Sequence, residues 1–246
     1  MGAITVVTSG KGGVGKTTTS ANLGTGLAML NKRVVLVDAD IGLRNLDLTL
    51  GMTDQALMDF TDVIQGRCSL EKAAAAHRGL QNLYLITAPV TLPAGVDEDG
   101  MRRLMRQVRE TFDYCIIDCP AGVGTGFRLA TCAADRCVVV TCTDASSLRD
   151  AQHTVMELER FGTGRLHLVV NRVRKKMLRS MHATIDDAID RAGLPLLGVV
   201  PEDDQLPLCL HHGVPLLLQS SNHAAAAYRN IAKRIQGGKV PLLRIR

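Results

Sequence analysis

The sequence predicts an α/β fold: a single doubly wound, mostly parallel sheet with helices on both faces. Three observations lead to this prediction. Short apolar runs alternate with longer segments of helical periodicity, as in proteins whose strands are joined by crossover helices. Most of these runs are continuous, which is typical of strands covered on both faces. A glycine-rich loop also joins the first apolar run to the first helical segment.

Seven strands and seven helices are expected along the 246 residues. The strands are the apolar runs Ala3–Thr8, Val34–Asp38, Leu83–Thr87, Tyr114–Asp118, Cys137–Thr141, Leu166–Val170 and Leu196–Val200. The helices are expected at 17–31, 54–65, 70–77, 97–111, 146–160, 180–192 and 223–236. No repeat or long linker interrupts this pattern, so residues 1–236 are assigned to one domain and 237–246 to a short basic and apolar tail.

The first strand, loop and helix form a phosphate-binding motif of the type G-x-x-x-x-G-K-T. Glycines let backbone N–H groups converge on phosphate oxygens, and the helix start adds a favourable dipole. Lys16 is expected to reach the β- and γ-phosphates and the Thr17 hydroxyl to bind Mg²⁺. The nucleotide-binding residues expected here are Gly10, Lys11, Gly12, Gly13, Val14, Gly15, Lys16, Thr17 and Thr18.

Three aspartates stand at or just after strand ends. Asp38 ends the second strand, Asp40 follows it, and Asp118 ends the strand that begins at Tyr114. Ligands of such sheets bind outside the carboxyl ends of the strands. An aspartate in this position beside a phosphate loop holds Mg²⁺ or its water, so Thr17, Asp38 and Asp118 are the expected metal site.

The base-binding side favours adenine. A guanine-specific site would show Asn-Lys-x-Asp after a late strand, whereas Leu166–Val170 is followed by Asn171, Arg172, Val173 and Arg174. An arginine therefore stands where the guanine-reading aspartate would be. Asn171 can offer its amide to a purine edge. The alternative is that Asn171 is only a turn residue.

Composition limits the other function classes. There are 29 Lys and Arg against 24 Asp and Glu, a net charge of +5, which permits an anionic partner without requiring one. Aromatic residues are 3% and there is no Trp, so base stacking on aromatic platforms is not expected. DNA is not expected as a partner. The seven cysteines show no C-x-x-C spacing, which argues against a metal cluster. Their odd number and the lack of a signal peptide favour a reducing cytosol.

With these residues identified, the chain resembles the deviant-loop P-loop ATPases, the group that includes MinD, ParA and the nitrogenase iron protein. Lys11 supplies the second lysine of their loop. The stretch D-I-G-L-R-N-L-D at 40–47 is most similar to the MinD family, since ParA-like proteins usually have D-x-D-P-Q there. The segments that carry the resemblance lie at 7–13, 38–47, 118–122, 146–150 and 200–203, so it extends over most of the chain.

The resemblance implies an ATP-dependent homodimer with two nucleotides at the interface. Lys11, Lys16 and Asp40 would be the catalytic residues. Lys11 would reach the partner's phosphates, as an arginine finger does, and Asp40 would position the attacking water. Asp38 and Asp118 would support Mg²⁺ largely through water. The base-binding residues would be Asn171, Arg172, Pro201, Glu202 and Asp203.

The expected function is therefore a slow, partner-stimulated ATPase that positions the division site, with a division inhibitor and an activating protein as partners. The alternatives are a related positioning ATPase, for flagella or chromosome partition, and a metabolic synthetase on the same fold.

MinD proteins end in a basic amphipathic helix that binds membrane. Here the residues after Gly237-Gly238 number only eight, with four bulky apolar residues and three cations in Lys239–Arg246. A cytoplasmic protein, peripheral on the inner face of an anionic membrane, is one expectation, and a packed or frayed terminus is the other.

Overall fold

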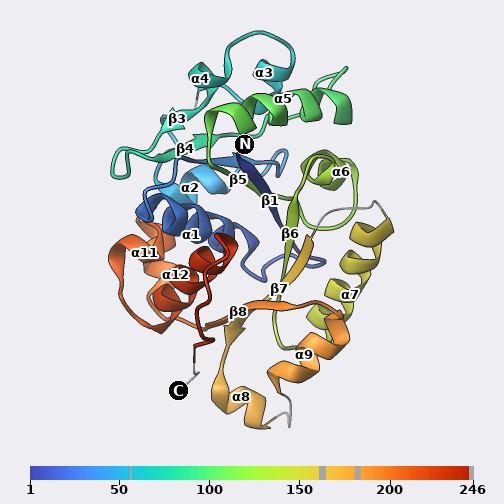
Figure 1. Cartoon of the computed structure of the whole chain (residues 1–246), viewed down its shortest axis with the longest axis vertical. Helices are drawn as coiled ribbons and strands as arrows, with labels where there is room; N and C mark the ends of the chain where they lie inside the picture. The colour runs from blue at the N-terminus through green and yellow to red at the C-terminus, as the bar shows by residue number, and fades with distance from the viewer. Residues whose placement is uncertain (56, 161–164, 181–183, 244–246) are drawn as a thin grey trace.

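A computed structural model describes residues 1–55, 57–160, 165–180 and 184–243. Its centre is an eight-stranded sheet of order β3-β4-β2-β5-β1-β6-β7-β8 (Figure 1). Within these residues every pairing is parallel except β3 with β4. The strands are β1 (Ala3–Thr8), β2 (Val34–Asp38), β3 (Ala75–Ala76), β4 (Leu83–Ile86), β5 (Tyr114–Asp118), β6 (Arg136–Thr141), β7 (Arg165–Val173) and β8 (Leu196–Pro201). The predicted fold class is confirmed.

Helices cover both faces of the sheet. One face carries α1 (Lys16–Met29), α2 (Leu46–Leu50), α10 (Leu206–His211), α11 (Leu216–Gln219) and α12 (His223–Ile235). The other carries α3 (Phe60–Ile64), α4 (Leu70–Ala73), α5 (Glu98–Thr111), α6 (Thr125–Thr131), α7 (Ala145–Arg160) and α9 (Ile185–Ala192). The short α8 (Lys175–Ser180) has no fully buried residue. Each face has its own apolar core.

The strands alternate between these two cores. In β1, Ile4 and Val6 pack under α5 and its neighbours, whereas Val7 packs under α1 and α12. All three side chains are fully buried. A strand that is covered on both sides needs apolar residues at successive positions, which explains the continuous apolar runs of the sequence.

Three predicted helices differ from the structure. In 54–65 only Phe60–Ile64 is helical, because a capping box between Asp59 and Asp62 begins the helix there and Asp59 bridges to Thr87. In 70–77 the helix ends at Ala73, and the following alanines pair with β4 as β3, so tertiary pairing overrides their helix propensity. In 180–192, Ser180 ends α8 and α9 starts at Ile185, while 181–183 lie outside the described residues.

Five short helices were not predicted. They are α2, α6, α8, α10 and α11, of four to seven residues each. Helices of this length complete too few turns to show a helical period in the sequence. Two of them, α2 and α10, lie against each other beside the nucleotide-binding end of the sheet.

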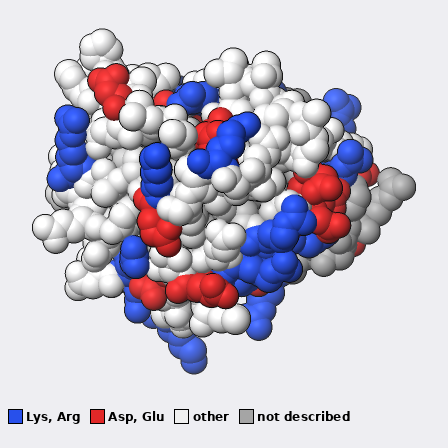
Figure 2. Space-filling view, turned by 90° about the horizontal axis from the view of Figure 1, so that it is seen from above, with Lys and Arg blue, Asp and Glu red and all other residues white. Residues whose placement is uncertain are grey.

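The surface carries charges of both signs. Seen from above the view of Figure 1, basic side chains are spread over the face, and one larger group of them borders acidic side chains (Figure 2). This mixture agrees with the modest net charge of +5.

Candidate active site

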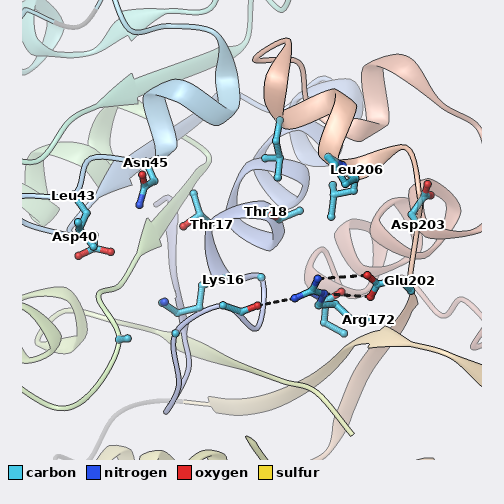
Figure 3. Close-up of a pocket in the computed structure, with 17 residues that line it drawn as sticks. Lys16, Thr17, Thr18, Asp40, Leu43, Asn45, Arg172, Glu202, Asp203 and Leu206 are labelled. Atoms are coloured by element: carbon cyan, nitrogen blue, oxygen red, sulfur yellow. Dashed lines mark hydrogen bonds and ion pairs between the residues drawn. The ribbon is translucent and has the colours of Figure 1, made fainter. Parts of the chain in front are cut away.

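A cavity of about 420 Å³ opens at the carboxyl ends of the strands (Figure 3). The loop after β1 and the start of α1 form its floor, and α10 forms one wall. It is lined by Gly12, Gly13, Gly15, Lys16, Thr17, Thr18, Asp40, Leu43, Asn45, Ala121, Asn171, Arg172, Glu202, Asp203, Leu206, Pro207 and Leu210. Most of the loop residues predicted from the sequence therefore line one cavity.

The loop keeps its shape through glycine geometry and Asn171. Gly13 and Gly15 have φ values of 79° and 93°, which side-chain-bearing residues rarely adopt. A Cβ on Gly15 would also lie 2.3 Å from Nδ2 of Asn171. That nitrogen donates a 2.8 Å hydrogen bond to the Val14 carbonyl. The Asn171 amide nitrogen therefore holds the phosphate loop.

The position of Asn171 corrects the predicted strand boundary. The strand was expected to end at Val170, but β7 continues to Val173 and contains both Asn171 and Arg172. The structure does not place Asn171 in a turn. Its side chain is buried at the cavity wall.

The start of α1 is prepared for an anion. Gly15 is the N-cap and offers no side chain, so the first N–H groups of the helix have no side-chain acceptor. Lys16 is only 9% exposed and lines the cavity together with Thr17 and Thr18. Burying an ammonium group is costly, and a phosphate in the cavity would offset that cost, as the charges of Asp40 and Asp118 also do. The site therefore fits a nucleotide phosphate chain.

Asp38 and Asp118 form a buried acidic pair behind the cavity. Asp38 accepts hydrogen bonds from the N–H groups of Asp40 (2.9 Å) and Leu46 (3.1 Å). Asp118 accepts one from the Ser20 hydroxyl at 2.8 Å. Burial, reinforced by the charge of Asp118, raises the pKa of Asp38 to about 7. Burial likewise raises the pKa of Asp118 to about 6. A divalent cation nearby would offset the cost of ionising both, so the donor set fits Mg²⁺.

Asp40 is the predicted catalytic carboxylate and lines the cavity itself. Burial raises its pKa, while the Lys16 charge acts in the opposite direction. In Figure 3 its side chain lies apart from those of Lys16 and Thr17, across the cavity. An acceptor at this place can hold a water molecule next to bound phosphates.

Lys11 is held away from the cavity. Its Nζ donates to the Ser146 hydroxyl at 2.9 Å and lies 3.8 Å from a carboxylate oxygen of Asp144. Burial alone would raise the pKa of Asp144. Hydrogen bonds from Ser147 and Ser146, together with the Lys11 charge, lower this pKa to about 2. Lys11 is half-exposed and is not among the residues that line its own cavity.

The base-binding side is organised around Glu202. Arg172 donates to the Gly13 carbonyl at 3.0 Å and pairs with Glu202 at 3.2 Å, so it links the loop to β8 (Figure 3). Asp203 accepts a hydrogen bond from Asn222, the N-cap of α12. Pro201 lines a small hollow beside the main cavity together with Tyr228. The predicted base-binding residues thus lie together.

Several residues at the site were not singled out from the sequence. Leu43 and Asn45 line the cavity and belong to the distinctive stretch at 40–47, which was the signal available. The wall formed by α10 carried no such signal.

Gly10 has a packing role that the loop pattern did not predict. A Cβ there would lie 2.1 Å from the Asp150 carbonyl, so the glycine permits close packing against α7. Within the described residues, no cluster of His, Cys, Asp and Glu could hold a metal by itself.

Comparison with known proteins agrees with this site. The model of the AAA domain family matches residues 2–163. The septum site-determining protein MinD of Bacillus subtilis (strain 168) is 43% identical over 246 residues, which cover 98% of this chain and 92% of that protein.

Two solved structures extend the match. The MinC:MinD cell division protein complex of Aquifex aeolicus matches with a TM-score of 0.92 and 35% identity over 98% of both chains. MinD of Pyrococcus horikoshii OT3, complexed with Mg-ADP, matches with a TM-score of 0.83 and 28% identity over 96% of both chains. The predicted resemblance, ATPase activity and nucleotide cofactor are confirmed. The chain belongs to the MinD family, the septum site-determining P-loop ATPases.

Proposed function

We propose that this MinD-family ATPase acts as a dimerising switch in which each subunit completes the other's active site. The observation that carries the proposal is the position of Lys11. Its ammonium group is half-exposed, is held by Ser146 and lies outside its own cavity. A cation in this position is available to a second copy of the chain. Delivered across an interface, it would stabilise the charge on the transferring phosphoryl group.

The other residues have separate roles in this proposal. Lys16 and the backbone N–H groups of the loop would bind the phosphates, and the Thr17 hydroxyl would hold Mg²⁺. Asp38 and Asp118 act on the metal through water, because neither lines the cavity. Mg²⁺ supplies charge neutralisation at the phosphate oxygens. Asp40 orients the water that attacks, and Arg172 with Glu202 and Asp203 forms the base-binding side.

Protein partners would act on the ATP-bound dimer. The Aquifex aeolicus relative is known in complex with MinC, and we propose a division inhibitor of that kind as a partner of this chain. An activating protein would stimulate hydrolysis and return the dimer to monomers. The output is the position of the division septum.

Membrane association is proposed to be peripheral. Within the described residues, no helix is both long enough and apolar enough to cross a membrane. The tail Lys239–Arg246 supplies cations and apolar side chains, and Leu242 in it is 50% exposed. A single copy would bind an anionic surface weakly, whereas a dimer presents two copies. This would place the protein on the inner face of the cell membrane.

The experiment that tests the proposal is Lys11→Ala, examined by size-exclusion chromatography with light scattering. We expect the variant to bind ATP with nearly normal affinity but to lose the ATP-dependent dimer and at least about 100-fold of the hydrolysis rate, as removal of an arginine finger does. Lys72→Ala, an exposed lysine on α4, is the control and should behave as the unmodified chain. A Lys11→Ala dimer of normal stability would contradict the assignment of Lys11 to the partner's nucleotide.

A further inference from the structure

Unsatisfied polar groups gather at the end of the sheet opposite the nucleotide. In the described part of the chain, five buried side-chain atoms lack a hydrogen-bond partner: Thr5 Oγ1, Thr8 Oγ1, Thr25 Oγ1, Arg136 Nε and His167 Nδ1. Three of these five, on Thr5, Arg136 and His167, come from the first three residues of neighbouring strands. Thr5 is the Cα partner of Arg136, and Val138 is the partner of His167. Residues partnered across neighbouring strands point to the same face of a sheet, and so do residues two apart in one strand. The side chains of Thr5, Arg136 and His167 therefore all lie on the α12 side.

Positive charge accumulates at the same place. Arg165 is the Cα partner of Arg136, so two arginines stand directly opposite each other on adjacent strands. Burial, and then the charge of Arg165, lowers the pKa of Arg136. Burial, and then the charge of Arg136, lowers the pKa of His167. Like charges in this arrangement repel each other.

The nearest carboxylate is already engaged. Asp135 accepts two hydrogen bonds from Arg109, at 2.6 and 2.9 Å, and a third from the Ile4 N–H at 2.8 Å. Its charge also acts on Arg136, but its hydrogen bonds are directed to Arg109 and Ile4 and not to Arg136 or Arg165. Among the described residues, no acidic side chain forms an ion pair with either arginine.

The guanidinium of Arg136 is only partly satisfied by the protein, and its unpartnered Nε is buried. Its Nη1 donates to the Ile235 carbonyl at the end of α12, at 3.1 Å. Nε has no partner, and the Nε side is the one from which arginine binds carboxylates and phosphates with two parallel hydrogen bonds. A C-capping role for α12 accounts for Nη1, but it leaves Nε, Arg165 and His167 unexplained.

We propose that Arg136, Arg165 and His167 form a second anion-binding site, and that its ligand is a phosphate group. Arg136 and Arg165 supply the charge and His167, once protonated, donates from Nδ1. The site is separate from the nucleotide cavity: Arg172 lies seven residue steps along β7 from Arg165, which at about 3.3 Å per step amounts to roughly 23 Å.

The C-terminal segment approaches the same end of the molecule. Arg234 on α12 donates to the Leu197 carbonyl at 2.7 Å and to the carbonyls of Val240 (2.9 Å) and Pro241 (2.8 Å). Since α12 lies along β8 (Figure 1), its last turn brings both this segment and Arg136 to one edge. A phosphate bound there could be inorganic phosphate or the headgroup of an anionic lipid.

The test is a titration of the Mg-ADP-loaded protein with inorganic phosphate, so that the phosphate loop is already filled. The readout is the His167 ring signal in NMR spectra, identified among the seven histidines by its loss in His167→Gln. We expect phosphate to raise the pKa of His167, because a nearby anion favours the imidazolium form. Arg165→Gln should weaken phosphate binding about tenfold. Arg179→Gln, an exposed cation on α8, should not change it.

A second arm distinguishes the two sources of phosphate. Sedimentation with phosphatidylglycerol vesicles is compared for the unmodified chain, Arg165→Gln and Arg179→Gln. The ligand is a lipid headgroup if two results are found together. Only Arg165→Gln lowers vesicle binding, and millimolar phosphate lowers vesicle binding more than chloride does at the same ionic strength. If phosphate binds through Arg165 but vesicle binding is unaffected, the ligand is free phosphate.

The proposal is overturned if neither phosphate nor vesicle binding depends on Arg165 and the His167 pKa does not move. In that case water alone satisfies these groups. Arg165→Gln should retain normal ADP affinity and ATP hydrolysis, because it lies outside the nucleotide site. A failure of this proposal therefore leaves the dimer switch untouched.

Discussion

At the scale of single residues, the buried pair Asp38 and Asp118 makes the stability of the protein depend on pH. Both carboxyls have pKa values raised above the ordinary value of 3.8, to about 7 and about 6. Between pH 4 and 7 the folded chain therefore binds more protons at these groups than the unfolded chain does. Their contribution to the free energy of unfolding is present at low pH and is lost as pH rises through this range.

Asp38→Asn should reduce this dependence. A full difference of one bound proton corresponds to a slope of about 1.4 kcal/mol per pH unit, which is the upper limit for one group. We expect the unfolding free energy of the nucleotide-free chain, measured by urea denaturation between pH 4.5 and 7, to fall less steeply with pH in the variant. The slope is compared because the amide accepts less well from the N–H groups of Asp40 and Leu46, which changes the absolute stability. Equal slopes would show that Asp38 does not titrate in this range.

Asp40 is the residue whose removal should separate binding from hydrolysis. It lines the cavity, but the phosphate-binding groups of the loop are other residues. We expect Asp40→Ala to bind ATP, to accumulate as the ATP dimer and to hydrolyse it at least about 100-fold more slowly, the usual contribution of a positioned base. Asp190→Ala on α9, an exposed carboxylate, is the control. Hydrolysis of ATP by Asp40→Ala at the normal rate would remove Asp40 from catalysis.

At the scale of elements, α12 connects the base-binding side to the opposite end of the sheet. Its N-cap, Asn222, accepts from the Ala225 N–H at 3.0 Å and donates to Asp203. Along its length α12 packs against α1, where Gly26 leaves room for Ala232 and Thr19 meets the Tyr228 hydroxyl at 3.5 Å. A change at the nucleotide thus has a continuous packed path to the last turn.

Asn222→Ala should therefore affect both stability and nucleotide affinity. Loss of the cap costs about 1 kcal/mol of unfolding free energy. Loss of the bond to Asp203 frees a cavity-lining side chain, so we expect a several-fold weaker ATP affinity by calorimetry. Thr184→Ala removes the equivalent cap of α9, on the other face, and should lower stability by a similar amount without changing affinity. Equal affinities of the two variants would contradict a link between α12 and the nucleotide.

The sequence predicted the elements whose burial is uniform and missed those that depend on distant partners. Continuous apolar runs located all the parallel strands, because strands covered on both faces are mostly apolar at successive positions. Arg136, at the start of β6, was left out because its acceptor is the carbonyl of Ile235, 99 residues away. The contact of Lys11 with Ser146 spans 135 residues and is likewise invisible in the local pattern. The phosphate loop was predictable because its glycines act within a single turn.

At the scale of the whole molecule, the tail is partly tied to the body of the protein. Val240 and Pro241 accept from Arg234, and Leu243 packs against the core beneath α12, whereas Leu242 is 50% exposed. The glycines 237 and 238 therefore redirect the chain back onto its own helix. Because only these few contacts hold the segment, its release from the protein surface requires little free energy.

Deletion of Lys239–Arg246 tests what this segment does for the assembled protein. We expect ATP hydrolysis and the ATP dimer to persist, because the nucleotide site lies at the other end of the sheet. The unfolding free energy should fall by about 1 kcal/mol, since Arg234 loses two acceptors. ATP-dependent sedimentation with anionic vesicles should disappear, because each dimer loses both of its weak anchors.

Leu242→Glu is the finer form of the same experiment. Burying one leucine in a membrane contributes at most about 1.5–3 kcal/mol, so two copies per dimer should make the loss easy to measure. Met156→Glu, at an apolar position of α7 that is 60% exposed, is the matched control and should sediment normally. Binding by the unmodified chain should weaken as salt rises, since part of the attraction is Coulombic. Equal sedimentation of the full-length and truncated chains would refute the anchor and direct attention to the exposed cations Arg174, Lys175 and Lys176. If neither chain sediments, the protein acts through protein partners without a lipid surface.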